Sequence, residues 1–211
     1  AMRRFFQEAR VVEEDGFLIG YLDSLRHEPP ENNIPMYCEF LKIANTQYRL
    51  YNPIAAKRRL RIANEILQAA DKLKLSRQHP VVVITIACVY GNEYAIKIMK
   101  FGANEQKFSP ENALADVQVI SRLAKLKKMI EIQCNEVGAP YKNVQYITGD
   151  IGLKFLLPCF VPTKLVLEEV AEGQQMTFHF SVKFNQIFSE IYEKSDGEYE
   201  QLLKIFEKIK Q

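Results

Sequence analysis

Val81-Val-Val-Ile-Thr-Ile-Ala87 is the stretch that decides the fold class expected from this sequence. It is short, rich in β-branched residues and free of charge, which is typical of a strand buried on both faces of a sheet. A second β-branched stretch, residues 144–148, follows after a long helical pattern. Because a helix between two strands is the usual connection of parallel strands, we expect an α/β fold. The sheet should be small, mainly parallel and flanked by helices.

The residues around these stretches predict helices and a hairpin. Residues 36–51 and 53–75 place apolar residues on one helical face, and Ser109-Pro110 is a capped helix start. Residues 164–182 predict a C-terminal antiparallel hairpin, followed by one or two helices. The expected organisation is a mainly helical N-terminal portion over residues 1–78 and an α/β portion over residues 79–211, together one continuous domain.

Composition bounds the class of protein. The 211 residues are 47% hydrophobic and 26% charged, which suits one domain with a real core. The net charge of +2 gives no global signal for nucleic acid or for a membrane. No apolar run has the length of a bilayer span, and none of the four cysteines forms a C-x-x-C pair. We expect a cytoplasmic protein with reduced thiols and no membrane partner.

One short stretch resembles a known repeat unit. Ile86-Ala-Cys-Val-Tyr-Gly91, with Phe101-Gly-Ala-Asn104 after it, is similar to a single ankyrin unit. The inner spacing is one residue short and no second copy follows. Because a repeat array needs several stacked units, we do not adopt a repeat architecture.

Four carboxylates are candidate metal ligands and catalytic residues. Asp150 follows the second β-branched stretch, and ligands gather at the carboxyl ends of strands in α/β sheets. Asp116 shares a face of a predicted helix with apolar residues. Asp23 ends the apolar stretch 17–22, and Glu93 opens a helix after residues 81–87. Each of the first two has a simpler alternative, since Asp150 is a good helix N-cap and Asp116 is a plausible helix-border acid in water.

The order of these acids resembles that of the PIN-domain nucleases. The best match is residues 112–156, with Asp116-x-x-x-Ile120 and Ile147-Thr-Gly-Asp-x-Gly-Leu153. The resemblance implies a divalent-metal-dependent ribonuclease in which Asp116 and Asp150 bind Mg²⁺ or Mn²⁺, and Asp23 and Glu93 complete the carboxylate cluster. Converging carboxylates raise one another's pKa unless a cation neutralises them, and a metal pair can clamp a phosphodiester. The Asp23-Ser24-Leu25 start and the long gaps depart from the family pattern, as in a noncatalytic relative.

Basic residues could bind the RNA that such an enzyme would cut. Arg58, Arg59 and Arg61 lie on one predicted helix, and Lys125 and Lys128 on another. A strip of such residues favours a phosphate backbone. The alternative is an ordinary solvated helix face.

A second function from a different class stays open. The amphipathic patterns at 36–51, 53–75 and 186–210 could present a groove or stripe to a protein partner. The chain would then be a nonenzymatic protein-interaction module or a fragment of a larger cytosolic protein. An exposed apolar patch would favour this class, and metal binding by Asp116 and Asp150 would favour the nuclease.

Overall fold

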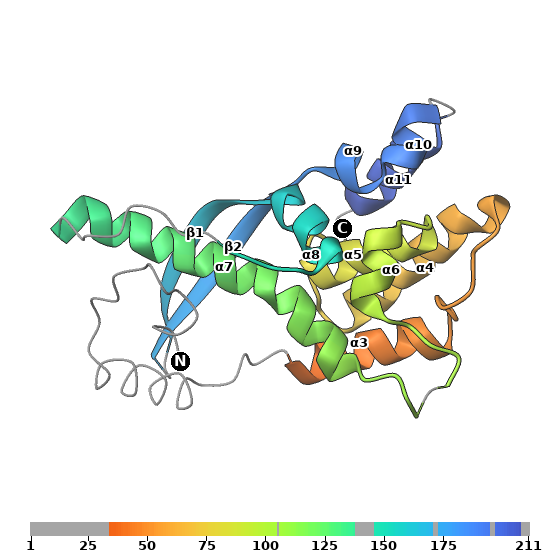
Figure 1. Ribbon diagram of the computed structural model, residues 1–211, viewed down its shortest axis with the longest axis horizontal. Coiled ribbons are helices and arrows are strands. Elements are labelled where there is room, and N and C mark those ends of the chain that lie inside the picture. The colour runs from red at the N-terminus through yellow and green to blue at the C-terminus, as the bar shows by residue number, and fades with distance from the viewer. Residues whose placement is uncertain (1–33, 105, 138–145, 171–172, 195–196, 208–211) are drawn as a thin grey trace. The chain divides into compact units, whose positions relative to one another are not determined.

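The computed structural model describes residues 34–104, 106–137, 146–170, 173–194 and 197–207 (Figure 1). Inside the long helix and the hairpin, only the backbone is described for residues 125, 129, 132–137, 164–170 and 173–179. The contacts divide the chain into a unit over Ala1–Ile34 and a unit over Pro35–Gln211. The first unit, apart from Ile34, lies outside the described residues, and so do Asp23 and the stretch 17–22.

The described part of the second unit is mostly helical and contains one two-stranded antiparallel sheet. The expected α/β fold with a mainly parallel sheet is therefore wrong. In chain order the elements are α3 (Ile34–Thr46), α4 (Ala56–Lys72), α5 (Pro80–Val89), α6 (Glu93–Met99), α7 (Pro110–Val137), α8 (Ile151–Leu156), the 3₁₀ helix η1 (Leu157–Cys159), β1 (Phe160–Val170), β2 (Gly173–Val182), α9 (Phe184–Ile187), α10 (Ser189–Lys194) and α11 (Glu198–Glu207). None of the described helices is both long and apolar enough to cross a bilayer.

The stretch 81–87 belongs to the central helix α5 and not to a strand. All ten residues of α5 are buried, and α4, α6 and α7 pack against it (Figure 1). A helix covered on every side is apolar all round, so its sequence shows no helical period. Local signals start it: Pro80 occupies the first turn, and Nδ1 of His79 accepts the N–H of Val81 at 3.2 Å. The Thr85 hydroxyl donates to the carbonyl of Val81 at 2.7 Å, which satisfies the one polar side chain inside this helix.

The second expected strand does not form either. Residues 146–150 have no regular secondary structure, and residues 144–145 lie outside the described part. No backbone hydrogen bond joins residues 146–149 to another described backbone group. A β-branched stretch becomes a strand only beside another strand. Within the described residues β1 and β2 pair only with each other, so residues 146–149 have no neighbouring strand there.

The amphipathic helices are confirmed, with shifted ends. α3 begins at Ile34, before the expected start at residue 36, and ends at Thr46, before the expected end at residue 51. α4 lies within the expected range of 53–75 but begins at Ala56, and its N-cap residue Ala55 makes no side-chain capping bond. Before this helix, Asn52 donates its N–H to the carbonyl of Arg49 in a turn. α7 begins at Pro110 as predicted, and the Ser109 hydroxyl accepts the N–H of Asn112 at 3.2 Å.

α5 and α6 form a helix pair that two asparagines fix in place. Gly91 takes the left-handed conformation between the helices, and Asn92 caps α6 by accepting the N–H groups of Tyr94 and Ala95. The buried Asn45 of α3 exchanges two hydrogen bonds with the backbone of Gly102 in the loop that follows α6.

The C-terminal hairpin plus helices is confirmed. β1 and β2 pair antiparallel from Phe160 opposite Val182, with an irregularity between Pro162 and Lys164. The strands begin at residue 160, earlier than the expected 164. The last helix, α11, packs on α4, where the Arg77 guanidinium makes a two-point ion pair with Asp71 and also donates to the carbonyl of Ile205. This clamp joins the end of the chain to the N-terminal half of the unit.

Candidate functional site

Asp116 is engaged in an ion pair. It lies near the start of α7, where its Oδ2 is 2.6 Å from Nζ of Lys100, the residue that ends α6. Lys100 has a left-handed backbone (φ 51°), which turns the chain out of α6. The charge of this expected metal ligand is therefore already balanced by a cation.

Asp150 is the N-cap of α8. Its Oδ1 accepts the N–H of Leu153 at 2.9 Å, and its own N–H donates to the hydroxyl of Thr148 at 3.0 Å. This is the alternative role considered from the sequence. The Asp150 side chain is exposed, so its charge stays hydrated. The N-terminus of a helix also stabilises a negative charge, so the capping role accounts for an acid at this position.

The remaining expected acids do not complete a cluster in the described part. Glu93 is exposed and lies 3.6 Å from Lys97 one turn later on α6. Asp23 lies outside the described residues. Among the residues that the structure describes, no group of three or more His, Cys, Asp or Glu could hold a metal ion. Metal binding by Asp116 and Asp150 stays a prediction.

Three of the five expected RNA-binding residues have local partners, each a different one. Arg59 is half-buried, donates to the carbonyl of Ile54 and lies over the ring of Tyr90. Arg61 lies 3.7 Å from Glu65. Lys128 pairs with Glu131 at 2.9 Å, Arg58 is exposed, and the side chain of Lys125 is not described. These contacts are those of charged residues on helix surfaces, and RNA binding by them stays a prediction.

The three cysteines whose side chains are described have buried thiols. Cys38, Cys88 and Cys159 are free and buried, and the side chain of Cys134 is not described. Burial raises the pKa of all three described thiols, that of Cys159 to about 11, although the nearby Lys183 lowers it somewhat. Thiols with raised pKa values are poor nucleophiles at neutral pH.

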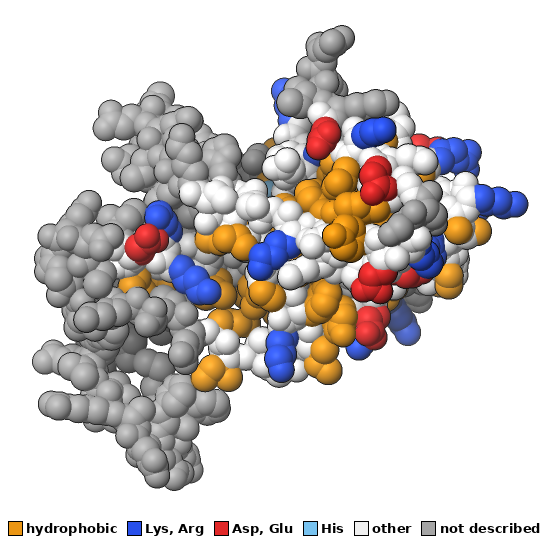
Figure 2. Space-filling model, turned by 90° about the horizontal axis from the view of Figure 1, so that it is seen from above, with side chains coloured by type: hydrophobic (Ala, Val, Ile, Leu, Met, Phe, Trp, Pro, Cys, Tyr) orange, Lys and Arg blue, Asp and Glu red, His pale blue; other side chains and the backbone are white. Residues whose placement is uncertain are grey.

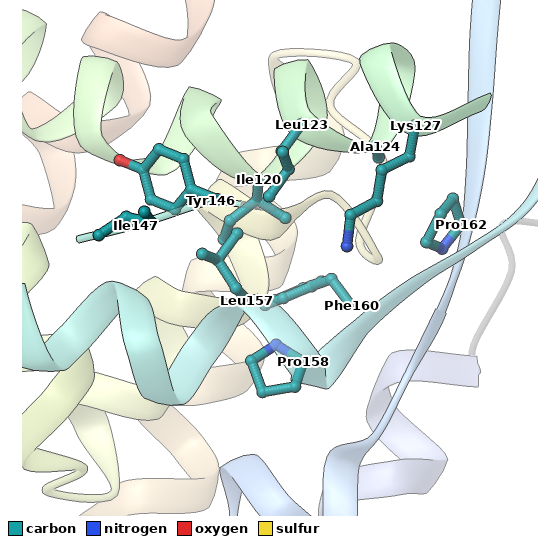
Figure 3. Close-up of a pocket in the computed structure, with 10 residues that line it drawn as sticks. All are labelled: Ile120, Leu123, Ala124, Lys127, Tyr146, Ile147, Leu157, Pro158, Phe160 and Pro162. Carbon is teal, nitrogen blue, oxygen red and sulfur yellow. The ribbon is translucent and has the colours of Figure 1, made fainter. Parts of the chain in front are cut away.

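A groove that none of the expected acids lines is a candidate binding site in the described part of the chain. This apolar groove has a volume of about 470 Å³ and is lined by Ile120, Leu123, Ala124, Lys127, Tyr146, Ile147, Leu157, Pro158, Phe160 and Pro162 (Figure 3). α7 forms one wall, the uncoiled residues 146–147 form another, and η1 with the start of β1 forms the floor. The volume lies within the range of about 300–1,000 Å³ of ordinary ligand sites.

Helical spacing builds the α7 wall. Three residues of the lining follow Ile120 at helical spacings: Leu123 three residues later, Ala124 four and Lys127 seven. These residues therefore share one face of the helix. Ile120 and Ala124 are buried against the rest of the unit, whereas Lys127 is exposed and reaches into the space beside Phe160 (Figure 3). Lys127 is the single charged residue of the lining, and no ion pair joins it to a carboxylate of the described residues.

Two unusually exposed apolar residues stand on the opposite rim. Ile147 is 80% exposed and Tyr146 is 43% exposed. Figure 2 shows one face of the molecule, where hydrophobic side chains gather with Lys and Arg side chains between them. Leaving a large aliphatic side chain in water forgoes about 1.5–3 kcal/mol of burial free energy. Exposed apolar residues beside a groove are typical of a binding surface.

The lining of the groove is mainly apolar. None of its ten residues is a carboxylic acid, a histidine, a cysteine, a serine or a threonine. Lys127 and Tyr146 are the two lining residues with a polar group at the end of the side chain, and the other eight are apolar. The groove offers apolar walls and one cation.

The sequence contained a signal for this groove that the site expectations missed. Lys127 follows the apolar residues Ile120, Leu123 and Ala124 on the same face of α7. A lysine on an apolar helix face is the signal that points to a site there. Residues 146–147 were read as a strand, and the four segments that meet at the groove are brought together only by the fold. Comparisons of the chain with family models, with curated proteins and with solved structures found no match.

Proposed function

We propose that this chain is a nonenzymatic protein-interaction module whose apolar groove binds an apolar segment of a partner protein. The observation that carries the proposal is the 80% exposure of Ile147 on the rim of a groove with apolar walls. A partner that covered Ile147 and filled the groove would bury apolar surface, which is the main favourable term in protein association.

The arrangement of the groove supports a macromolecular partner over a small molecule. Its rim extends to side chains that stand out in solvent, Tyr146 and Ile147, so an occupant of the groove must also reach over the rim. Interaction sites of this kind combine a buried apolar centre with aromatic residues near it. The ribonuclease hypothesis lacks a comparable supporting observation, because its two described metal ligands each have a structural role.

A matched pair of surface variants tests the proposal. Ile147→Glu places a charge on the groove rim, and Ile96→Glu places the same charge on α6 at a residue that is 44% exposed and outside the groove lining. Both residues are exposed, so both variants should fold, which a thermal melt verifies. In quantitative pull-down from source-cell extract, we expect proteins retained by the wild type and by Ile96→Glu to fall at least fivefold with Ile147→Glu. Equal recovery by all three proteins would refute the groove as the binding site.

A further inference from the structure

Part of the backbone beside the groove has no backbone hydrogen-bond partner among the described residues. Residues 146–148 form an uncoiled stretch that leads into α8 (Figure 1), and no described backbone group pairs with them. Their side chains, Tyr146, Ile147 and Thr148, are of the types that favour strands. An unpaired strand-like stretch is a template on which another chain can add as a strand.

Lys127 sets the charge that an occupant should carry. Its side chain extends into the groove, where the other nine lining residues are uncharged (Figure 3). The next residue, Lys128, is already paired with Glu131, whereas Lys127 has no ion pair within the described part of the chain. Because Lys127 is exposed, an ion pair with a carboxylate of the occupant would contribute modestly to affinity, and it would select for an acidic side chain at this place.

These two observations together define one class of occupant. We propose that the groove binds a short extended peptide segment of the partner, which adds as a strand to residues 146–148 and pairs an acidic side chain with Lys127. An apolar side chain of the peptide would fill the space between α7 and η1. A helical segment fits less well, because its own backbone groups are already paired and leave those of residues 146–148 unused. This inference rests on the proposed function and names the partner's chemistry.

The test uses a phage-displayed library of random linear twelve-residue peptides. The library is selected on the full chain and counter-selected on the Ile147→Glu variant. The best peptide is synthesised in its normal form and with N-methyl groups at alternate residues, which remove the N–H donors that strand pairing needs. Fluorescence anisotropy then measures its affinity for the wild type, for Lys127→Gln and for the matched control Lys128→Gln.

We expect the selected peptides to carry an acidic residue. Affinity should fall about threefold to fivefold with Lys127→Gln, as for a solvent-exposed ion pair. It should fall about tenfold or more with one of the two alternate sets of N-methyl groups, and less than twofold with Lys128→Gln. Selected peptides that bind through the groove but tolerate both N-methylated sets, or that ignore Lys127, would overturn this inference and leave the proposed function standing. A selection that yields no peptide able to distinguish the wild type from Ile147→Glu would overturn both.

Discussion

Nζ of Lys100 lies 2.6 Å from Oδ2 of Asp116, so the end of α6 is joined to the first turns of α7 by an ion pair. A divalent cation at Asp116 would have to displace this ammonium. The contact therefore bears directly on the ribonuclease hypothesis, since Asp116 is one of its two expected metal ligands.

The first prediction concerns metal binding. Titration of the wild type with Mn²⁺ or Mg²⁺ to millimolar concentration should leave its melting temperature unchanged, because Asp116 is paired and Asp150 is a helix cap. A bound metal would instead add about 2.7 kcal/mol at a hundredfold excess over its Kd. The control is the Asp116→Asn/Asp150→Asn double variant. Stabilisation of the wild type that this variant lacks would restore the carboxylate metal site.

The second prediction separates capping from catalysis at Asp150. Asp150→Ala should cost about 1 kcal/mol of unfolding free energy, because the N–H of Leu153 loses its acceptor. Asp150→Asn should cost less than half of that, since an asparagine amide also caps a helix. Urea denaturation measures both values. Equal losses in the two variants would show that the charge of Asp150, and not its capping bond, matters for stability.

The third prediction concerns the close approach of α8 to α6. A Cβ atom at residue 152 would lie 2.9 Å from Cγ1 of Ile98 and 2.9 Å from the carbonyl oxygen of Tyr94. Gly152→Ala should therefore push α8 away from α6 and cost about 1–3 kcal/mol. Gly149→Ala is the matched control, because its Cβ would meet nothing within 4 Å. Thermal melts that showed the same change for both variants would contradict this packing.

The fourth prediction is acid sensitivity that originates at His79. Burial lowers the pKa of His79 to about 4, and the ring stacks on Tyr37 while its Nδ1 caps α5. The unfolded chain, with an ordinary histidine pKa near 6.5, binds more protons below that pH, so stability is complete above about pH 6.5 and is lost as the pH falls toward 4. The loss due to His79 should reach about 2 kcal/mol between pH 7 and pH 5.

Urea denaturation at several pH values measures this loss. His79→Asn keeps a side chain that can cap α5 but does not titrate, so it serves as the control. The variant's stability should fall by about 2 kcal/mol less than that of the wild type over the same pH range. Parallel pH profiles for the two proteins would assign the acid sensitivity to other groups.

Local chemistry in the sequence determined the amphipathic helices and several of their ends. The caps at Ser109, Asn92 and Asp150 and the proline at the start of α7 act within one helical turn, so sequence reasoning found the helix starts that they mark. The hairpin could also be predicted locally, because apolar and polar residues alternate within 164–182 around a polar turn. The helix periodicity of α3, α4 and α7 was visible because each has one face in water.

Tertiary structure decided what these local signals left open. An apolar run such as 81–87 fits a buried strand and a fully buried helix equally well, and only its burial among α4, α6 and α7 makes it a helix. Residues 146–148 have the composition of a strand, but pairing needs a neighbour that the described fold does not supply. The groove combines residues 120–127 of α7 with residues 146–147, η1 and the start of β1, which come later in the chain. Periodicity reports which face of one element is apolar, whereas a site made from several elements exists only once they have packed together.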